Sequence, residues 1–296
     1  MKASTDCIVC VFWQALRTAR LMTDDEALHK KVLAKVSAWI AKADLETSPA
    51  VLSKPVYRII CEVMNNDDPF KIYKKRSNTA ALSLLPYLRE LVAQSHNQLE
   101  TALRISALGN LIDFGIGHNF DIEREIKENI SKDFAINAVA EFEKELRPDC
   151  KLLYLGDNAG EIVMDMILIE LLKKRGVQVT YTVKSAPIIN DSTMEDAIEC
   201  GMTSVTKVIT TGGDDIGINW NNVSEEFREA FSSADVILAK GHGNFETCDD
   251  REENIYFLLK VKCHVVARQL GVNEGCSVFV NSKMLREKRK SVRRTE

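Results

Sequence analysis

Asp157 and Asn158 stand side by side in residues 156–161, between two apolar stretches of different character. Residues 151–155 form a short apolar run, as in a strand, and residues 162–174 form an amphipathic run, as in a helix. In an open α/β sheet, ligands bind beyond the carboxyl ends of the strands. Carboxylate and amide oxygens in that place suit Mg²⁺, Mn²⁺ or a similar ion. The segment therefore predicts half of a metal site, with a simple helix N-cap at Asp157 as the alternative.

A second carboxylate, Asp191, follows the next predicted strand, residues 178–183. Because the carboxyl ends of parallel strands lie along one edge of a sheet, the loops after them can converge on one crevice. Asp157, Asn158 and Asp191 could then bind one divalent ion through oxygen atoms and leave positions for water and substrate. Asp191 also suits a helix N-cap, and the polar segment at residues 211–215 could be only a turn.

The segment after the fourth predicted strand could hold a phosphate group. Gly241 and Gly243 let the backbone approach a ligand closely, and Lys240 stands where the strand delivers it to the crevice. Backbone amides and an ammonium group together suit phosphoryl oxygens. His242 could act as an acid or base, although orienting the loop is its plainer role.

A metal ion beside a phosphate group predicts phosphoryl transfer to water, in which positioning and electrostatic stabilisation provide most of the rate. The chain has no Walker pattern and no complete G-x-G-x-x-G after its first predicted strand. Both absences argue against an ATP-driven machine and a dinucleotide-dependent dehydrogenase. The predicted catalytic residues are Asp157, Asn158, Asp191 and Lys240.

The elements that must position these residues change in kind near residue 148. Before it, apolar residues recur at helical spacing, for example over residues 10–22, 70–94 and 96–112. After it, short apolar runs alternate with helical stretches, which predicts βαβ units and a mostly parallel sheet. We predict an all-helical N-terminal domain, residues 1–147, and an α/β domain, residues 148–296. The predicted strands are residues 152–155, 178–183, 207–210, 236–239, 264–267 and 277–280.

The composition limits the function further. The chain has 296 residues, and its net charge of -4 argues against a general nucleic-acid binder. No run approaches the ~18 apolar residues that a membrane helix needs, and the N-terminus lacks the features of a secretory signal, so a cytoplasmic location is expected. Cys7 and Cys10 are the one close cysteine pair. A buried structural pair is favoured over a zinc or redox role, because no second pair follows at similar spacing.

At these residues the chain resembles the metal-dependent damage-control phosphatase family, formerly classed as a domain of unknown function. The resemblance covers nearly the whole chain, and its motifs occur in the right order. Residues 7–10 and 109–113 resemble the prokaryotic, cysteine-containing subfamily. His264 departs from that subfamily, whose members often carry Pro after the cysteine, and it could alter the edge of the last strand without touching the proposed metal ligands. The matching segments are residues 156–161, 190–191, 240–246 and 260–263.

The resemblance implies a helical N-terminal region packed on a Rossmann-like α/β domain. It implies a divalent ion (Mn, Mg, Co or Ni) at Asp157, Asn158 and Asp191, with substrate phosphate near residues 240–244. It also implies that Glu161 belongs to the site and that Lys262 contacts substrate. Asn110 and Asp113 lie three apart on an otherwise apolar predicted helix, which favours a place near the site. The predicted substrate-binding residues are Glu161, Gly241, His242, Gly243, Asn244, Lys262, Asn110 and Asp113.

Members of this family hydrolyse phosphate esters of small metabolites, including damaged or side-product sugar phosphates. We therefore predict a divalent-metal-dependent phosphatase with a small phosphorylated metabolite as its partner. The alternatives are an S-adenosylmethionine-dependent carboxyl methyltransferase on the same fold and a non-catalytic metal or redox protein. The sequence leaves open the substrate, the metal and the oligomeric state. It also leaves open whether water activated by the metal attacks phosphorus or Asp157 attacks first.

Overall fold

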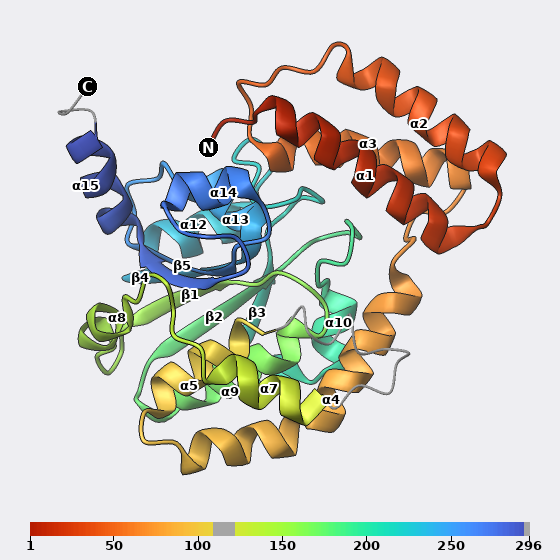
Figure 1. Cartoon of the computed structure of the whole chain (residues 1–296). Coiled ribbons are helices and arrows are strands. Elements are labelled where there is room, and N and C mark those ends of the chain that lie inside the picture. Colours follow the sequence, from red (N-terminus) through yellow and green to blue (C-terminus); the bar gives the residue numbers. More distant parts are fainter. Residues whose placement is uncertain (109–121, 293–296) are drawn as a thin grey trace.

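The computed structural model describes residues 1–108 and 122–292. Within this part of the chain, six strands form one sheet in the order β3-β2-β1-β4-β5-β6 (Figure 1). Neighbouring strands are parallel, except that β6 runs antiparallel to β5. The predicted Rossmann-like, mostly parallel α/β fold is confirmed. The strands are β1 (Lys151–Leu155), β2 (Gln178–Val183), β3 (Lys207–Thr210), β4 (Val236–Lys240), β5 (Ile255–Lys260) and β6 (Ser277–Asn281).

One predicted strand is wrong, and one strand was missed. Residues 264–267 begin α14 (His264–Leu270), which ends at Gly271 with a left-handed φ of 66°. A short apolar run does not distinguish a strand from a buried helical turn, which explains the error. The missed strand is β5, whose first five residues are all buried. His264 is therefore not at a strand edge, and its Nε2 lies 3.0 Å from Asp6 Oδ2.

Helices surround the sheet. Seven described helices precede β1, and seven follow it. The first group is α1 (Thr5–Met22), α2 (Glu26–Ile40), α3 (Pro49–Met64), α4 (Lys71–Gln94), α5 (Gln98–Ser106), α7 (Ile122–Ile130) and α8 (Val139–Glu145). The second group is α9 (Glu161–Lys174), α10 (Met194–Glu199), α11 (Met202–Val205), α12 (Glu225–Ser233), α13 (Gly241–Cys248), α14 and α15 (Ser282–Val292).

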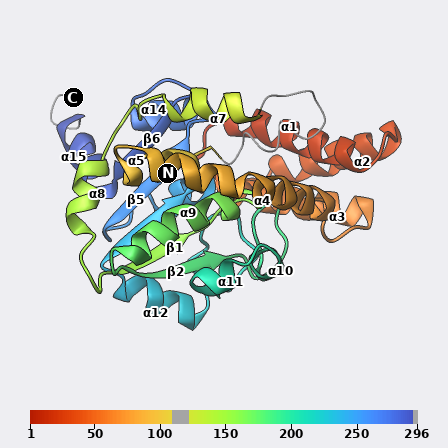
Figure 2. The same cartoon turned by 90° about the horizontal axis from the view of Figure 1, so that it is seen from below.

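The sheet has a core on each face. Alternate residues of β1 point to opposite faces, so Leu152 and Tyr154 enter one apolar cluster and Leu153 and Leu155 enter another. The first cluster also contains side chains of α4, α5 and α9, and the second contains side chains of α12, α13 and α14. Figure 2 shows α4, α5 and α9 on one side of the sheet and α12 on the other. The predicted boundary at residue 148, which stays a prediction, therefore separates segments that share a core.

Helices α1, α2 and α3 form a unit of their own, at the upper right of Figure 1. They share a small apolar cluster that includes Val11, Val36 and Leu52. Ser48 caps α3 by accepting from the Val51 N–H, and Pro49 follows at the first helical position, as the sequence pattern Ser-Pro favours.

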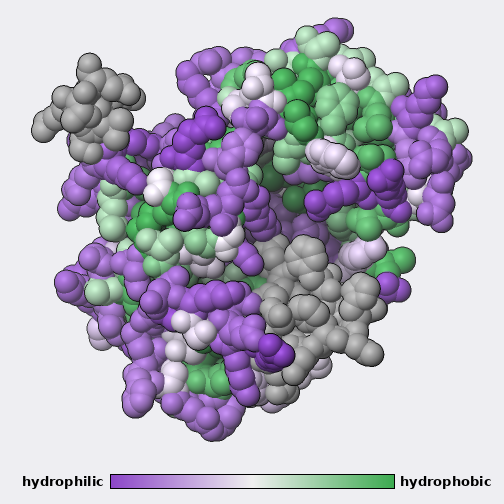
Figure 3. Space-filling model, viewed as in Figure 1, coloured by the Kyte–Doolittle hydropathy of each residue, from purple (hydrophilic) through white to green (hydrophobic). Residues whose placement is uncertain are grey.

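The outer face of this unit carries apolar surface, visible at the upper right of Figure 3. Val9 and Trp13 on α1 are 58% and 59% exposed. The predicted buried cysteine pair is wrong in part, because Cys7 is buried and Cys10 is exposed. Among the described residues, no helix combines the length and apolar character needed to cross a membrane.

Candidate active site

The loops after β1 and β2 pair with each other at the carboxyl edge of the sheet. Asn158 and Asp191 form an isolated antiparallel bridge. The Ser192 N–H donates to Asp157 O at 2.8 Å, and the Ala159 N–H donates to Asn190 O at 2.9 Å. The structure therefore brings together Asp157, Asn158 and Asp191, which the sequence placed after two separate strands. The sheet also changes winding direction here, because β4 lies on the other side of β1 from β2.

The three acidic side chains of this region lie in a buried environment. Burial raises the pKa of Asp157 well above its usual value, and the negative charges of Asp191 and Glu161 raise it further. Burial also raises the pKa of Asp191 to about 6, against the lowering effect of Lys184. Glu161 behaves oppositely, because the positive charges of Lys240 and Lys262 outweigh burial and lower its pKa. Buried carboxylates that resist joint ionisation are a setting in which a divalent cation stabilises the charged forms.

The donor atoms fit a hard divalent ion. Asn158 Nδ2 donates to Asp157 Oδ2 at 2.9 Å and to Glu161 Oε1 at 3.0 Å, which fixes the orientation of the amide. Two carboxylates and one amide oxygen are ligands that Mg²⁺ and Mn²⁺ accept. No group of three or more His, Cys, Asp or Glu side chains within residues 1–108 and 122–292 is arranged to hold a metal. The predicted set counts only two such residues, Asp157 and Asp191.

The loop after β2, which carries Asp191, has a strained backbone two residues before Asp191. Ile189 adopts a φ of 40°, in the left-handed region that β-branched residues rarely adopt. Its neighbour Ile188 packs against Tyr57 of α3, so the α1–α3 unit covers this loop. Strain of this kind, which costs on the order of 1–3 kcal/mol, persists where surrounding structure holds it and occurs often at ligand sites.

Lys240 ends β4 and is almost fully buried, with 2% of its surface exposed. Its Nζ lies 2.6 Å from Ser106 O, 2.8 Å from Glu161 Oε2 and 2.9 Å from Asp165 Oδ1. An ammonium group has three N–H bonds, so these three acceptors can use all of them. Burial lowers the pKa of Lys240, but the two carboxylates raise it above its usual value. The predicted contact between Lys240 and phosphate stays a prediction.

Gly241 starts α13 and packs its backbone against Asp157. It has a φ of 77°, and a Cβ atom there would lie 2.0 Å from Asp157 Oδ2. Asn244, one turn further, donates to Gly156 O at 3.0 Å and to Lys240 O at 2.8 Å, which ties α13 to the turn after β1. The Oδ1 atom of Asn244 is buried and has no hydrogen-bond partner. The N-terminus of α13 is therefore aligned with the candidate metal ligands.

His242 and Lys262 link α13 to the segment that follows β5. The Lys262 N–H donates to His242 Nε2 at 3.0 Å. Burial and the charge of Lys262 lower the pKa of His242 to about 4, so its ring is neutral near pH 7. The Lys262 side chain is exposed, and its charge lowers the pKa of Asp157, Glu161 and Asp191. This geometry fits the predicted loop-orienting role of His242.

Six predicted residues line one small hollow at this edge of the sheet: Asp157, Glu161, Lys240, Gly241, His242 and Lys262. Asn110 and Asp113 lie outside the described residues, so their predicted place near the site stays untested.

Two residues of the site were missed by sequence reasoning. Asp165 lies one helical turn after Glu161 on α9 and is fully buried. Lys184 follows β2, and its Nζ lies 3.7 Å from Asp191 Oδ2 and 2.5 Å from Gly217 O. An acid within the apolar run of α9 was a usable signal for Asp165, because an unpaired charge is costly to bury.

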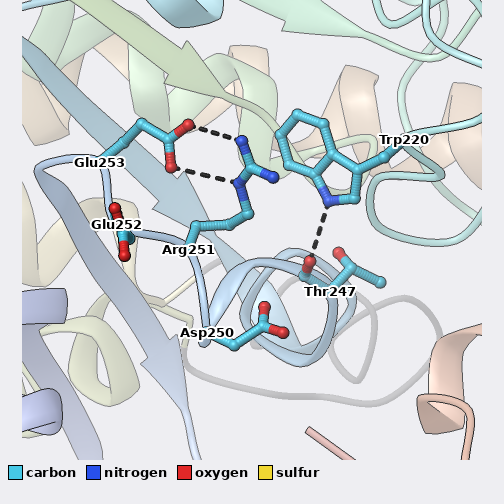
Figure 4. A pocket seen from close by; sticks show the side chains of 6 residues that line it. All are labelled: Trp220, Thr247, Asp250, Arg251, Glu252 and Glu253. Carbon is cyan, nitrogen blue, oxygen red and sulfur yellow. Dashed lines mark hydrogen bonds and ion pairs between the residues drawn. The ribbon is translucent and has the colours of Figure 1, made fainter.

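A larger hollow of about 420 Å³ lies beyond the far end of α13. Arg251 stacks over the Trp220 ring at 4.2 Å and pairs with Glu253, so its charge is already balanced (Figure 4). None of the predicted site residues lines this hollow. The predicted site residues lie instead around the smaller hollow, at the edge between β1 and β4.

Fold and site together define a Rossmann-like α/β protein with an acidic candidate metal centre at the switch point of its sheet. Comparison with known families places it more narrowly. The model of the damage-control phosphatase ARMT1-like domain matches residues 3–278. The chain belongs to this damage-control phosphatase family, as the sequence resemblance predicted.

Individual relatives match this chain over nearly their full lengths. A protein named damage-control phosphatase from Pyrococcus horikoshii is 34% identical over 287 residues, which cover 96% of this chain and 99% of the relative. A second, from Archaeoglobus fulgidus, is 35% identical and covers 93% and 97%. The crystal structure of a DUF89 family protein from P. horikoshii matches with a TM-score of 0.88 at 34% identity. It covers 95% of this chain and 99% of that one.

Proposed function

We propose that this protein is a divalent-metal-dependent phosphatase that hydrolyses phosphate monoesters of small metabolites. The observation that carries the proposal is the meeting of Asp157, Asn158 and Asp191 beside the N-terminus of α13. The names of the P. horikoshii and A. fulgidus relatives support the same activity. Sugar-phosphate-like compounds, including damaged or side-product metabolites, are the substrate class that we propose. A cytoplasmic location remains an expectation from the sequence.

The proposed roles follow from where the side chains lie. Asp157, Asn158 and Asp191 would hold the ion, which supplies Lewis acidity and lowers the pKa of water when bound. Backbone N–H groups at the start of α13 would donate to the phosphate, where the helix dipole favours negative charge. Lys262 is exposed beside the carboxylates and would contact the phosphate from the other side. His242 would keep Lys262 in place through its backbone contact.

Metal dependence is the first test. We expect hydrolysis of an aryl phosphate when Mg²⁺, Mn²⁺, Co²⁺ or Ni²⁺ is supplied, and none in chelator. Asp157→Ala should lose the activity and also the metal-induced rise in melting temperature, because a ligand that binds only the folded state stabilises it. Asp44→Ala, which removes an exposed carboxylate outside the site, is the matched control and should keep both. Full activity in chelator would contradict the proposal.

The attacking group needs a separate experiment. If Asp157 attacks phosphorus first, acid-quenched enzyme should carry label from a radiolabelled phosphate ester during turnover. If water attacks directly, quenched enzyme should carry no label at any time point. The methyltransferase alternative predicts a rise in melting temperature with S-adenosylmethionine, and a flat titration at saturating cofactor would exclude it.

A further inference from the structure

Asp165 is a buried acid near the site that accepts hydrogen bonds from four side chains, although it does not line the hollow. Its side chain is 0% exposed. Ser106 Oγ donates to Oδ1 at 2.6 Å, and Tyr154 Oη donates to the same oxygen at 2.8 Å. Tyr181 Oη donates to Oδ2 at 2.8 Å, and Lys240 Nζ donates to Oδ1 at 2.9 Å. Side chains of β1, β2, β4 and α5 therefore converge on one carboxylate.

We propose that Asp165 is a positioning residue of the phosphatase site, which fixes the Lys240 ammonium against Glu161. Among the predicted site residues that the structure describes, Lys240 is the one to which Asp165 is hydrogen-bonded. The inference rests on the proposed phosphatase function, because it assigns Asp165 a part in that reaction.

The geometry explains why Lys240 needs such a partner. Glu161 and Asp165 lie four residues apart on α9, so they face the same side of the helix and both reach the Lys240 Nζ. Ser106 O accepts the remaining N–H. Lys240 is thus a fixed positive charge behind Glu161, and Glu161 in turn accepts from the Asn158 amide. A chain of contacts leads from Asp165 through Lys240 and Glu161 to a predicted metal ligand.

The two tyrosines make this arrangement rigid. Tyr154 and Tyr181 are both fully buried, and their rings lie 5.1 Å apart. Each hydroxyl is used to donate to Asp165, which satisfies a group that would be costly to bury alone. If Asp165 became neutral, Lys240 would lose one of its two charged partners. We expect the ammonium then to shift relative to Glu161 and to disturb the Asn158 amide.

The test is a double-mutant cycle with Asp165→Asn, Lys240→Met and the combined variant. Removing an outer partner of a ligand commonly lowers activity or metal affinity about 10–100-fold, and we expect that loss in kcat for Asp165→Asn. If Asp165 acts through Lys240, the combined variant should be no slower than Lys240→Met alone. Losses that multiply in the combined variant would overturn the inference.

Metal affinity, measured by calorimetry, gives a readout that does not need turnover. Asp165→Asn removes a negative charge near the carboxylates, so it should weaken Mn²⁺ binding by about tenfold or more. Asp249→Asn is the matched control, because Asp249 is 1% exposed and accepts from Gln269 and Arg289 at the far end of α13. This control should lower the melting temperature while keeping kcat and Mn²⁺ affinity.

Tyr181→Phe keeps the inference testable if Asp165→Asn does not fold. It removes one donor from the carboxylate and keeps the charge, so we expect a smaller loss of kcat that disappears in the Lys240→Met background. A lower melting temperature with unchanged kcat and Mn²⁺ affinity would show that Asp165 only stabilises the fold. The wild-type protein could also lack phosphatase activity while Asp165→Asn still weakens its Mn²⁺ binding. That result would contradict the proposed reaction, but it would support the positioning role of Asp165.

Discussion

At the scale of single residues, the backbone of Gly241 lies directly against the carboxylate of Asp157, a candidate metal ligand. We predict that Gly241→Ala abolishes metal-dependent activity, because its Cβ would overlap the Asp157 carboxylate and push it from the site. The measurement is the metal-induced shift in melting temperature together with kcat.

Gly201→Ala provides the control for this prediction. Gly201 has a φ of 80°, close to that of Gly241, but a Cβ there meets no atom within 4 Å. The Gly201→Ala variant should lose on the order of 1 kcal/mol of stability from backbone strain alone and keep its activity. Equal activity in Gly241→Ala and Gly201→Ala would show that the contact with Asp157 does not matter.

Some individual residues were predictable and others were not. Asp157, Asn158 and Asp191 could be predicted from sequence because each follows a recognisable strand, and the structure brings them together. The predicted contact of Lys240 with phosphate stays a prediction, and the sequence did not predict the protein acceptors that its Nζ contacts, which include Ser106 O and Glu161 Oε2. The acceptors of a buried lysine depend on which helix packs against its strand, and the local sequence pattern does not predict that helix.

At the scale of elements, ion pairs connect α3 to the loop after β3. Lys54 Nζ on α3 lies 2.9 Å from Asp214 Oδ1 and 2.7 Å from Asp215 Oδ1. Arg58, one turn later, also pairs with Asp214. These contacts fasten the α1–α3 unit to the carboxyl edge of the sheet, beside the loop that carries Asp191.

This attachment should depend on pH. Burial raises the pKa of Asp215, but hydrogen bonds from Lys54, Asn222 and Asn219 outweigh burial and leave it below its usual value. A lowered folded-state pKa means that the stabilisation is present above the unfolded pKa of about 3.9 and is lost as pH falls through the folded value. We predict that the wild type loses more free energy of unfolding than Asp215→Asn between about pH 5 and pH 3.

Urea unfolding of both proteins across that range is the measurement. Asn222→Ala, which removes one of the donors to Asp215, should lie between the two curves. Parallel curves for wild type and Asp215→Asn would mean that this carboxylate ionises alike in the folded and unfolded chains.

The elements themselves were predictable where their sequence patterns were unambiguous. The strands β2 and β3 have the predicted bounds, and β1, β4 and β6 differ by one residue at one end. The strand β5 was missed and α14 was misassigned, because both are short apolar segments near polar turns. Only pairing with β4 on one side and β6 on the other decides that residues 255–260 form a strand.

At the scale of the whole molecule, the helical half completes the core of the sheet half. Side chains such as Leu85 and Leu88 of α4 and Leu103 of α5 share one apolar cluster with α9 and with β1. We predict that a fragment of residues 148–296 does not fold cooperatively. Each large apolar side chain that loses its burial costs about 1.5–3 kcal/mol, and several of them together exceed a net stability of about 5–15 kcal/mol.

Near-ultraviolet circular dichroism and urea unfolding of the fragment, beside the full chain, are the measurements. A sharp, reversible transition in the fragment would show that the division near residue 148 marks an independent domain. The overall Rossmann-like order was predictable from alternating strands and helices. The shared core was not, because helical periodicity shows that α4 and α5 have an apolar face without naming what covers it.

The antiparallel strand β6 ends the sheet, and the chain before β1 lies along its outer side. The Ala135 N–H donates to Ser277 O, the Phe279 N–H donates to Ile136 O, and the Ala138 N–H donates to Phe279 O, all between 2.8 and 2.9 Å. A bare strand edge is a template on which another molecule can add its own strand, and aggregates begin there. Residues 135–138 cover this edge of the sheet. We therefore expect substitutions that detach them to promote self-association, which would appear first as turbidity in concentrated solution.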